Sequence, residues 1–313
     1  MIRIATRRSP LAKWQANHVA DLLRGQEPGL TVRLHELVTR GDKILEVPLA
    51  AVGGKGLFVK EIEDALLNRD AEVAVHSMKD LPALLAPGLT VGAVPEREDP
   101  RDALCSGKAR SLSDLPKGAR VGTSSLRRGA QLKALRPDLR IEMVRGNVET
   151  RLRKGETELD AVVLAYAGLR RLGLADRASY LFDPSEMLPA VAQGALALEA
   201  RADDAATLAR LARLDHAETR IRVEAERGFL RRLEGGCQVP LAGHATVQAG
   251  RVTLRGLVAS VDGSRVVRGE RSGPAADAAG IGEALAEELL GKGAAEILRE
   301  TEGRGPALPA PKR

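Results

Sequence analysis

Arginine and hydroxyl side chains occur together where an expected strand leads into an expected helix. In the first such turn, Arg7 and Ser9 follow the apolar run 2–6, and Pro10 opens the helix. Ser9 can cap this helix, and the free N–H groups of its first turn attract an anion when an arginine lies beside them. Taken alone, however, this turn is more typical of an ordinary capped helix.

The same arrangement recurs twice further along the chain. Three consecutive hydroxyl residues are followed by two arginines, and a later strand-to-helix turn carries two more arginines. Arginine binds carboxylates through two parallel hydrogen bonds, so three such turns around one cleft predict a site for a polyanion. The side chains concerned are Thr123, Ser124, Ser125, Arg127, Arg128, Arg145 and Arg151.

One carboxylate stands out beside this basic set. Asp80 lies just beyond the apolar strand expected at 73–77 and directly follows Lys79. Open α/β sheets bind their ligands at the carboxyl ends of strands. Asp80 is therefore either a carboxylate placed to face a developing positive charge or a structural partner of a nearby arginine. Its spacing alone does not decide between the two.

Two glycine-rich segments carry reactive or charged groups. Gly235 and Gly236 remove side-chain bulk beside the thiol of Cys237, although most lone cysteines are buried and inert, which is the interpretation we favour for Cys105. Lys55 stands among the glycines of 53–56, where the serine or threonine that a phosphate-binding loop requires after its lysine is missing. We expect the segment 41–56 to be a mobile lid that contributes one cation.

Composition excludes several classes of function. The 313 residues carry a net charge of +6, and the segment 117–154 alone holds eleven basic and three acidic residues. Aromatic residues make up only 2%, which leaves few side chains to stack on nucleic-acid bases. The five histidines and two cysteines show no metal-ligand spacing, and no apolar stretch approaches the roughly 18 residues of a membrane span. The few cysteines and the absence of a signal peptide favour the cytoplasm.

Short strands alternate with helices over the first 200 residues, which indicates α/β domains with largely parallel sheets. The expected strands are 2–6, 32–38, 73–77, 90–94, 120–122, 141–144 and 161–165, and the expected helices are 10–24, 57–68, 126–135, 148–153 and 205–233. Strands at 239–247, 252–260 and 265–273 with a helix at 281–299 predict a small α+β domain.

Two proline-containing segments, 95–100 and 184–194, are expected to cross between domains. Two crossings around one internal block indicate an inserted domain and a hinge. The expected first domain comprises residues 1–96 and 195–214, the second 97–194 and the third 215–300. The proline-rich end, 301–313, is expected to be a disordered tail.

Several of these motifs together resemble the porphobilinogen deaminase (hydroxymethylbilane synthase) family. The resemblance runs in order from about residue 2 to about residue 299. It rests on Ile4-Ala5-Thr6-Arg7, Ser9-Pro10-Leu11-Ala12, Trp14-Gln15, Gly53-Gly54-Lys55-Gly56-Leu57-Phe58, His76-Ser77-Met78-Lys79-Asp80, Gly122-Thr123-Ser124-Ser125-Leu126-Arg127-Arg128, Arg145-Gly146-Asn147 and Gly235-Gly236-Cys237.

The resemblance implies two domains like type II periplasmic binding proteins, joined by a hinge, and a small α+β third domain. It implies a cytoplasmic, monomeric transferase of tetrapyrrole biosynthesis that needs no metal, membrane or nucleic acid. The implied reaction joins four porphobilinogen molecules head to tail into hydroxymethylbilane, with release of ammonia, on a covalently bound dipyrromethane cofactor. The alternative is a non-enzymatic two-domain protein that binds an anion.

The resemblance also implies a role for individual residues. Asp80 is implied to be the catalytic residue, and Cys237 to hold the cofactor through a thioether. The residues implied to bind the cofactor are Cys237, Ser77, Lys79, Thr123, Ser124, Ser125, Arg127, Arg128 and Arg145. Those implied to bind substrate are Arg7, Ser9, Gln15, Lys55, Arg145, Arg151 and Arg171.

Overall fold

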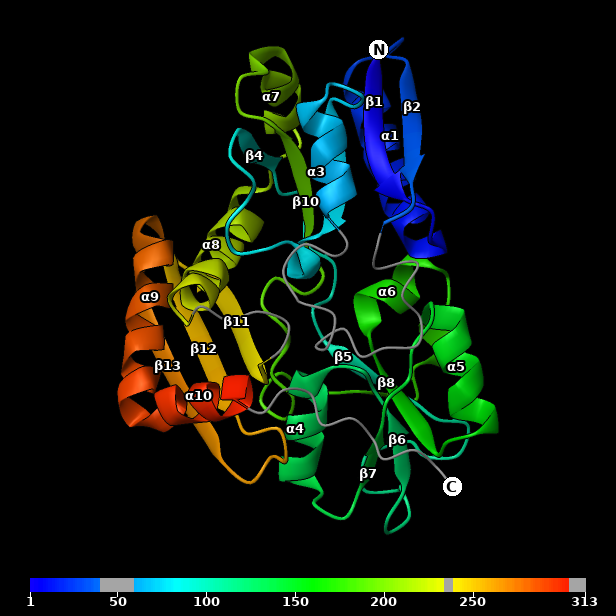
Figure 1. Ribbon diagram of the computed structural model, residues 1–313, viewed down its shortest axis with the longest axis vertical. Helices are drawn as coiled ribbons and strands as arrows, with labels where there is room; N and C mark the ends of the chain where they lie inside the picture. Colours follow the sequence, from blue (N-terminus) through cyan, green and yellow to red (C-terminus); the bar gives the residue numbers. More distant parts are fainter. Residues whose placement is uncertain (40–58, 234–238, 304–313) are drawn as a thin grey trace.

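The computed structural model describes residues 1–39, 59–233 and 239–303, and three sheets organise them (Figure 1). The first sheet has five strands in the order β2-β1-β3-β10-β4. Its strands are β1 (Ile2–Arg7), β2 (Val32–Leu37), β3 (Val73–Ser77), β4 (Leu89–Ala93) and β10 (Leu196–Arg201). Helices α1 (Pro10–Gln26), α3 (Lys60–Leu67) and α7 (Ala205–Ala212) pack against it.

The second sheet repeats this arrangement with the order β7-β6-β8-β5-β9. Its strands are β5 (Asp102–Cys105), β6 (Arg120–Gly122), β7 (Arg140–Glu142), β8 (Ala161–Ala165) and β9 (Tyr180–Leu181). The helices that accompany it are α4 (Leu126–Leu135), α5 (Val148–Thr157) and α6 (Tyr166–Arg171). Two mixed five-stranded α/β sheets confirm the predicted fold class of the first two-thirds of the chain.

The expectation of largely parallel sheets is wrong for one strand in each sheet. β10 runs antiparallel to both β3 and β4, and β5 runs antiparallel to both β8 and β9. Each of these strands enters its sheet directly after the chain has crossed from the other sheet, between β4 and β5 or between β9 and β10. The chain arrives from the opposite end of the sheet, which reverses the direction of the strand.

The third sheet is an antiparallel meander, as predicted. It consists of β11 (Leu241–Gln248), β12 (Arg251–Ala259) and β13 (Val266–Pro274). Helices α8 (Ala217–Arg232) and α9 (Ala278–Leu289) pack on one another and on this sheet, and α10 (Ala295–Gly303) follows. Residues 301–303 belong to α10, so the expected tail begins three residues too early; its remainder, 304–313, lies outside the described residues.

Two helices expected to be continuous are divided in the structure. The expected helix 205–233 is split into α7 and α8, where the His216 side chain accepts a hydrogen bond from the Thr219 backbone N–H and begins a new helix. The expected helix 281–299 is interrupted at Gly293, whose φ of 105° lies in the left-handed region. The break separates α9 from α10.

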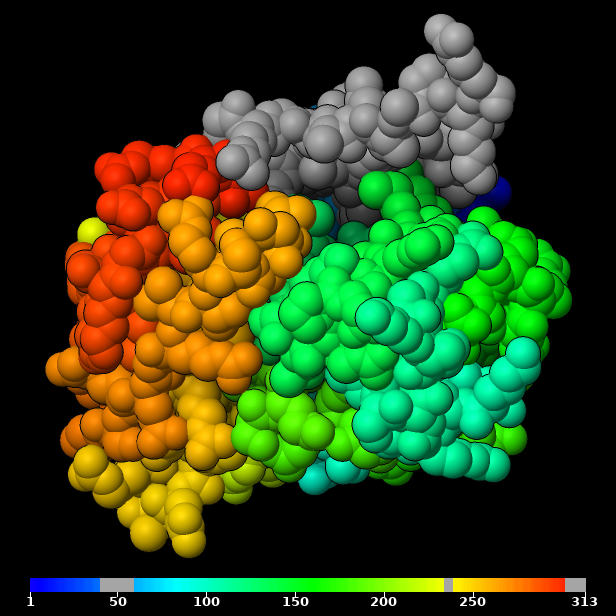
Figure 2. Space-filling model, turned by 90° about the horizontal axis from the view of Figure 1, so that it is seen from below, coloured from blue at the N-terminus to red at the C-terminus, as the bar shows by residue number. Residues whose placement is uncertain are grey.

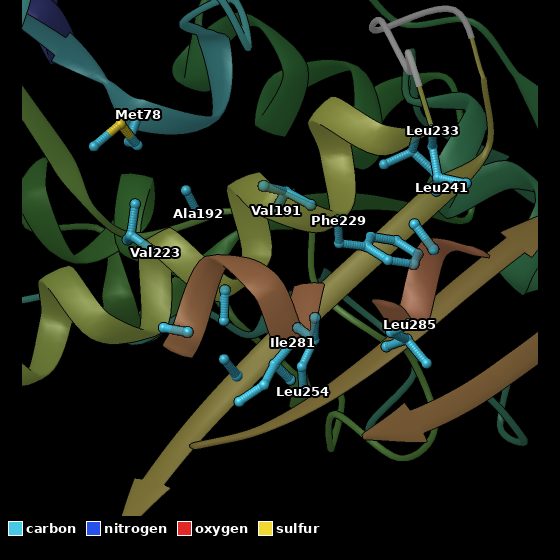
Figure 3. Packing of buried hydrophobic residues seen from close by; sticks show 14 of the residues in the cluster. Met78, Val191, Ala192, Val223, Phe229, Leu233, Leu241, Leu254, Ile281 and Leu285 are labelled. Carbon is cyan, nitrogen blue, oxygen red and sulfur yellow. The ribbon is translucent and has the colours of Figure 1, made fainter. Parts of the chain in front are cut away.

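A single apolar cluster joins α8, α9 and the third sheet to the first sheet. Figure 3 shows Phe229 of α8 among Leu254, Ile281 and Leu285, with Met78 at the far side of the same cluster. A smaller cluster joins α4 to β12, and in Figure 2 the orange surface of the third sheet meets the green surface of the second. No helix among the described residues is long and apolar enough to span a membrane.

Candidate active site

The Asp80 side chain is exposed beside a pocket at the carboxyl end of the first sheet. β3 leads into a single 3-10 turn, Met78–Asp80, in which Met78 is 2% exposed, and Leu81 after it is 3% exposed. The pocket is lined by Arg7, Ser9, Leu11, Ala12, Gln15, Val59, Ile62, Val75, His76, Ser77 and Asp80. Buried neighbours on either side thus hold a carboxylate that itself faces the pocket.

The first predicted anion turn forms one wall of this pocket. Ser9 caps α1, and its Oγ accepts a hydrogen bond of 3.3 Å from the Ala12 backbone N–H. One turn further along α1, the Gln15 amide donates to Ser77 Oγ at 2.8 Å. Arg7, at the end of β1, lines the same pocket. The polar groups predicted from the N-terminal motif therefore converge near Asp80.

The second predicted turn is built as expected but its arginines are not open cations. Ser125 caps α4, accepting from the Arg128 N–H at 3.4 Å, and Thr123 Oγ1 accepts from the Ser125 N–H at 3.2 Å. Arg127 and Arg128 are 5% and 6% exposed. Both bind the carboxylate of Asp102, at 2.7 and 2.8 Å.

Asp102 was not identified from the sequence, although it determines the state of both arginines. It is completely buried on β5. Burial by itself would raise the pKa of this carboxyl group. The charges of Arg127 and Arg128 lower the pKa by more than burial raises it, so it lies well below its usual range. Because Arg127 also donates to the Leu188 carbonyl at 2.8 Å, its role in this structure is to tie α4 to neighbouring segments.

Gln193, also absent from the predicted site, links Lys79 to the second sheet. Its Oε1 accepts hydrogen bonds of 3.3 Å from Lys79 Nζ and from Arg128, and its Nε2 donates to Asp102 at 2.9 Å. Burial, followed by the positive charge of Arg128, lowers the pKa of Lys79 to about 8. Asp80 and Asp102 oppose this shift. Lys79 and the arginines of α4 therefore share one polar centre between the two sheets.

Arg151 brings the third predicted turn to the same centre. Asn147 caps α5 through a 2.8 Å bond from the Thr150 N–H, and Arg151 Nε donates to the Gly146 carbonyl at 2.9 Å. Burial lowers the pKa of Arg151 to about 10; the charge of Arg128 acts in the same direction, Asp80 opposes it, and Arg145 lowers it further. The partly buried Arg151 thus lies close enough to Asp80, Arg128 and Arg145 for their charges to act on it.

Arg171 is held against the N-terminal helix rather than in open solvent. Its guanidinium donates to the Gly194 carbonyl at 2.6 Å and lies 5.9 Å from the centre of the Trp14 ring. Burial lowers the pKa of this residue to about 10. Arg171, Gln15, Ser77 and Lys79 line a second pocket that adjoins the first.

Some predicted residues cannot be placed. Lys55, with the expected lid 41–56, and Cys237 lie outside the described residues. The remaining cysteine, Cys105, is buried in β5, and burial raises its thiol pKa to about 12, which makes it unreactive. Within the described ranges no group of three or more acidic, histidine or cysteine side chains is arranged to hold a metal ion.

Family comparisons cover almost the whole chain. The model described as "Porphobilinogen deaminase, dipyromethane cofactor binding domain" matches residues 2–209, and that described as "Porphobilinogen deaminase, C-terminal domain" matches 220–291. The chain belongs to the porphobilinogen deaminase family. A porphobilinogen deaminase of Syntrophobacter fumaroxidans is 53% identical over 96% of this chain and 97% of its own. That of Nitratidesulfovibrio vulgaris is 56% identical over 97% of this chain and 98% of its own.

Two solved binding proteins resemble about two-thirds of this deaminase family member weakly. A methionine-binding lipoprotein of Bacillus subtilis is 16% identical, covers 68% of this chain and 89% of its own, and has a TM-score of 0.42. The methionine-binding protein MetQ is 13% identical with the same coverages and a TM-score of 0.44. The sheet topology described above, rather than these likenesses, establishes the fold.

The polar centre fits the cofactor that the matching deaminase domain is named for. Dipyrromethane carries carboxylate side chains on both pyrrole rings, and carboxylates require cations or N–H donors when they are removed from water. Lys79, Arg145 and Arg151 present such groups from both sheets. Burial is the main cause of the lowered pKa values of Lys79 and Arg151. A carboxylate bound beside these groups would favour their charged forms.

Proposed function

We propose that this protein joins four porphobilinogen molecules head to tail into hydroxymethylbilane, releasing ammonia at each step, on a dipyrromethane cofactor held by Cys237. The family assignment supports the activity. The observation that supports the site is the convergence of Lys79 and Arg151, from the two sheets, on one exposed carboxylate, Asp80, with Arg145 close to Arg151. A cationic site with one anion suits substrates that carry carboxylates and develop a positive charge.

The cations bind and orient the acidic side chains. Each porphobilinogen carries an acetate and a propionate, so every addition brings two further carboxylates into the cleft. Arg145 precedes the Gly146 turn at the start of α5, and Arg151 follows it and donates to the Gly146 carbonyl. When bound, the cofactor supplies the ring carbon to which the first substrate is joined. Ser9, Gln15 and Ser77 provide neutral hydrogen-bond partners in the adjoining pocket.

Asp80 supports the chemical step. Loss of ammonia from porphobilinogen leaves a positive charge spread over the pyrrole ring, and a carboxylate fixed beside the ring N–H stabilises this charge where it develops. The same oxygen atoms can accept the proton that the ring releases after each condensation. Asp80→Asn keeps the shape but not the charge, so we expect the folded variant to bind substrate and to lose nearly all turnover.

Mass spectrometry of the intact protein tests the proposal. The freshly purified chain should carry the mass of two pyrrole units, and adding porphobilinogen should produce discrete species that are each one pyrrole heavier. The modification should map to the peptide containing Cys237. Cys237→Ser should lack it, whereas Cys105→Ser should retain it.

An active protein of unmodified mass, or an adduct on Cys105, would contradict the proposed anchor. Binding of porphobilinogen without product would favour the anion-binding alternative. We further propose that the enzyme acts as a cytoplasmic monomer, without metal, membrane or nucleic acid. Sedimentation analysis of the holoenzyme tests the monomer, because a stable dimer would double the observed mass.

A further inference from the structure

Arg227 binds the backbone immediately after Asp80. It is a residue of α8, the helix packed on the third sheet, and its guanidinium reaches three consecutive carbonyl oxygens of the first-sheet loop. The Arg227 guanidinium donates to the carbonyls of Leu81 at 3.4 Å, Pro82 at 2.7 Å and Ala83 at 3.0 Å. One side chain thus holds the segment that leaves the Asp80 turn.

The environment of Arg227 is unusual for a charged group. The residue is 9% exposed, and no carboxylate of the described chain lies within ion-pair distance of it. Burial lowers its pKa to about 10, with the charge of Arg231 acting in the same direction and that of Glu199 opposing it. A buried cation that binds only neutral carbonyls loses hydration energy and has no ion pair to offset that loss. Folding alone gives little reason for an arginine here.

The other face of the turn is fixed by apolar packing on the same helix. Met78 begins the turn and Leu81 follows it, and both belong to the cluster that contains Val223 and Phe229 of α8. Figure 3 shows Met78, Val223 and Phe229 within this cluster. Asp80, between Met78 and Leu81, is the exposed residue of the turn. Apolar side chains therefore fix the depth of the turn, and the three carbonyl contacts fix its direction along α8.

Helix α8 has a second connection to the proposed chemistry. It ends at Arg232, and the chain reaches Cys237 only a few residues later in the sequence. The helix that holds the Asp80 turn is therefore the helix from which the proposed cofactor-bearing segment departs. A rigid element that holds both the catalytic carboxylate and the attachment point of the cofactor keeps the distance between them fixed.

From these contacts we propose that Arg227 is a positioning residue that holds the Asp80 carboxylate in register with α8. The inference rests on the proposed function, because it assigns Arg227 a role through Asp80. Without the three carbonyl contacts, the turn keeps its apolar anchors but can rotate about them. A displacement of about 1 Å at a reacting group is enough to lower a rate by about 100-fold.

Two substitutions separate the effect of the three carbonyl hydrogen bonds of Arg227 from the effect of its charge. Arg227→Gln removes the charge and the forked donor, and Arg227→Lys keeps the charge but cannot reach three carbonyls at once. With the holoenzyme, we expect kcat for porphobilinogen to fall by about 10- to 100-fold in both variants, with much smaller changes in KM. The matched control is Arg231→Lys, four residues later on α8, where the side chain is about a third exposed and pairs with Glu283. It should retain the wild-type kcat.

A double-mutant cycle distinguishes positioning from general stabilisation. If Arg227 acts through the Asp80 charge, Arg227→Gln should lower the single-turnover rate of wild type strongly but that of Asp80→Asn hardly at all. Hydrogen exchange of the backbone at 78–83 should rise in the variants while exchange in β12 stays unchanged. Equal losses in both backgrounds, or a wild-type kcat in folded Arg227→Gln, would overturn the inference.

The same assays separate this inference from the function on which it rests. A wild-type protein without a covalent dipyrrole or turnover would contradict the proposed function and the inference together. Wild-type turnover with unaffected Arg227 variants would contradict the inference alone. If Arg227→Gln fails to fold, Arg227→Lys decides: a normal kcat in it overturns the role, and a lowered kcat at unchanged cofactor content supports it.

Discussion

Lys79 illustrates how the environment of one ammonium group can couple ligand binding to pH. Its folded pKa of about 8 lies below the ordinary value of 10.5, so the unfolded chain binds more protons between these two pH values. This group therefore makes the free energy of unfolding rise as the pH increases from about 8 to 10.5. A carboxylate bound at Lys79 favours the charged form and should raise its pKa again.

We predict that cofactor assembly raises the pKa of Lys79 from about 8 toward its ordinary value. Carbon-13 NMR of lysine side chains, with the signal assigned by its loss in Lys79→Arg, measures the pKa in the holoenzyme and in Cys237→Ser. The pKa should be higher in the holoenzyme. Equal values in the two proteins would show that no carboxylate of the cofactor reaches Lys79.

Arg127 requires a different interpretation from the one that the sequence suggested. An arginine after three hydroxyl residues appeared to be an open ligand for carboxylates. The structure places it in a buried ion pair with Asp102 instead. Its assignment to the cofactor stays a prediction, but any loss of cofactor in an Arg127 variant must be separated from loss of the fold.

Arg127→Leu should lower the free energy of unfolding by about 3 kcal/mol, because it leaves the buried Asp102 carboxylate with one guanidinium instead of two. Urea denaturation measures this change. The exposed Arg8 provides the comparison, since Arg8→Leu should alter stability by no more than about 0.5 kcal/mol. Similar stabilities of the two variants would show that the buried pair contributes nothing.

The sequence predicted site residues whose partners are nearby in the chain better than residues whose partners are distant. Ser9 and Ser125 were recognised because a helix cap and its N–H partner are only three residues apart. Asp102 binds side chains 25 and 91 residues away, at Arg127 and Gln193. No local pattern encodes such pairs. A lone aspartate within the apolar run of β5 was the available signal.

At the scale of elements, α8 and α9 approach closely because glycines face each other across their contact. A Cβ at Gly282 would collide with the Ala225 carbonyl oxygen and would lie 2.6 Å from the Phe229 backbone nitrogen. A Cβ at Gly228 would collide with the Ala279 carbonyl in the same way. The helices can pack at this distance only if both positions lack a side chain.

Gly282→Ala should therefore force α9 away from α8 and lower the free energy of unfolding by about 1–3 kcal/mol. Alanine has a higher helix propensity than glycine, so a Gly→Ala substitution at an unobstructed helical site should raise the free energy of unfolding. Gly25 in α1 is such a site, because nothing lies within 4 Å of a Cβ there. Thermal denaturation compares the two; a stabilised Gly282→Ala would contradict the tight contact.

Most helix and strand positions followed from local patterns, whereas three strands, the helix α6, strand direction and the helix breaks did not. The predicted strands 73–77 and 161–165 match β3 and β8 residue for residue. The break between α7 and α8 was missed because apolar spacing continues through the cap at His216. β5, β9 and β10 were not among the expected strands. The antiparallel direction of β5 and β10 could not be predicted either, because it depends on where the chain enters a sheet, which no window of residues records.

At the scale of the whole molecule, Glu226 joins both crossings between the first two sheets to the third sheet. Its buried carboxylate accepts from Arg97 at 2.7 and 3.1 Å, from the Ala192 N–H at 2.5 Å and from the Ala245 N–H at 2.8 Å. Arg97 and Ala192 lie in the two segments that cross between the first two sheets, and Ala245 lies in β11. Four hydrogen bonds to one carboxylate thus fix the crossings against the third sheet.

Glu226→Gln should lower the free energy of unfolding by about 3–5 kcal/mol, because it leaves the Arg97 cation buried without its counter-charge. Urea denaturation of Glu224→Gln, an exposed change on the same helix, provides the reference and should differ little from wild type. Equal unfolding midpoints for the two variants would indicate that the crossings are held by other contacts.

The placement of β10 between β3 and β4 has a consequence for synthesis on the ribosome. β4 is completed at Ala93, but the strand that joins it to β3 ends only at Arg201, roughly a hundred residues later. All strands of the second sheet emerge in between, within residues 102–181. Although domains usually fold in their order of translation, the inserted sheet is here the first that can close. The N-terminal strands must wait, with one edge of β3 uncovered, until the returning strand leaves the exit tunnel.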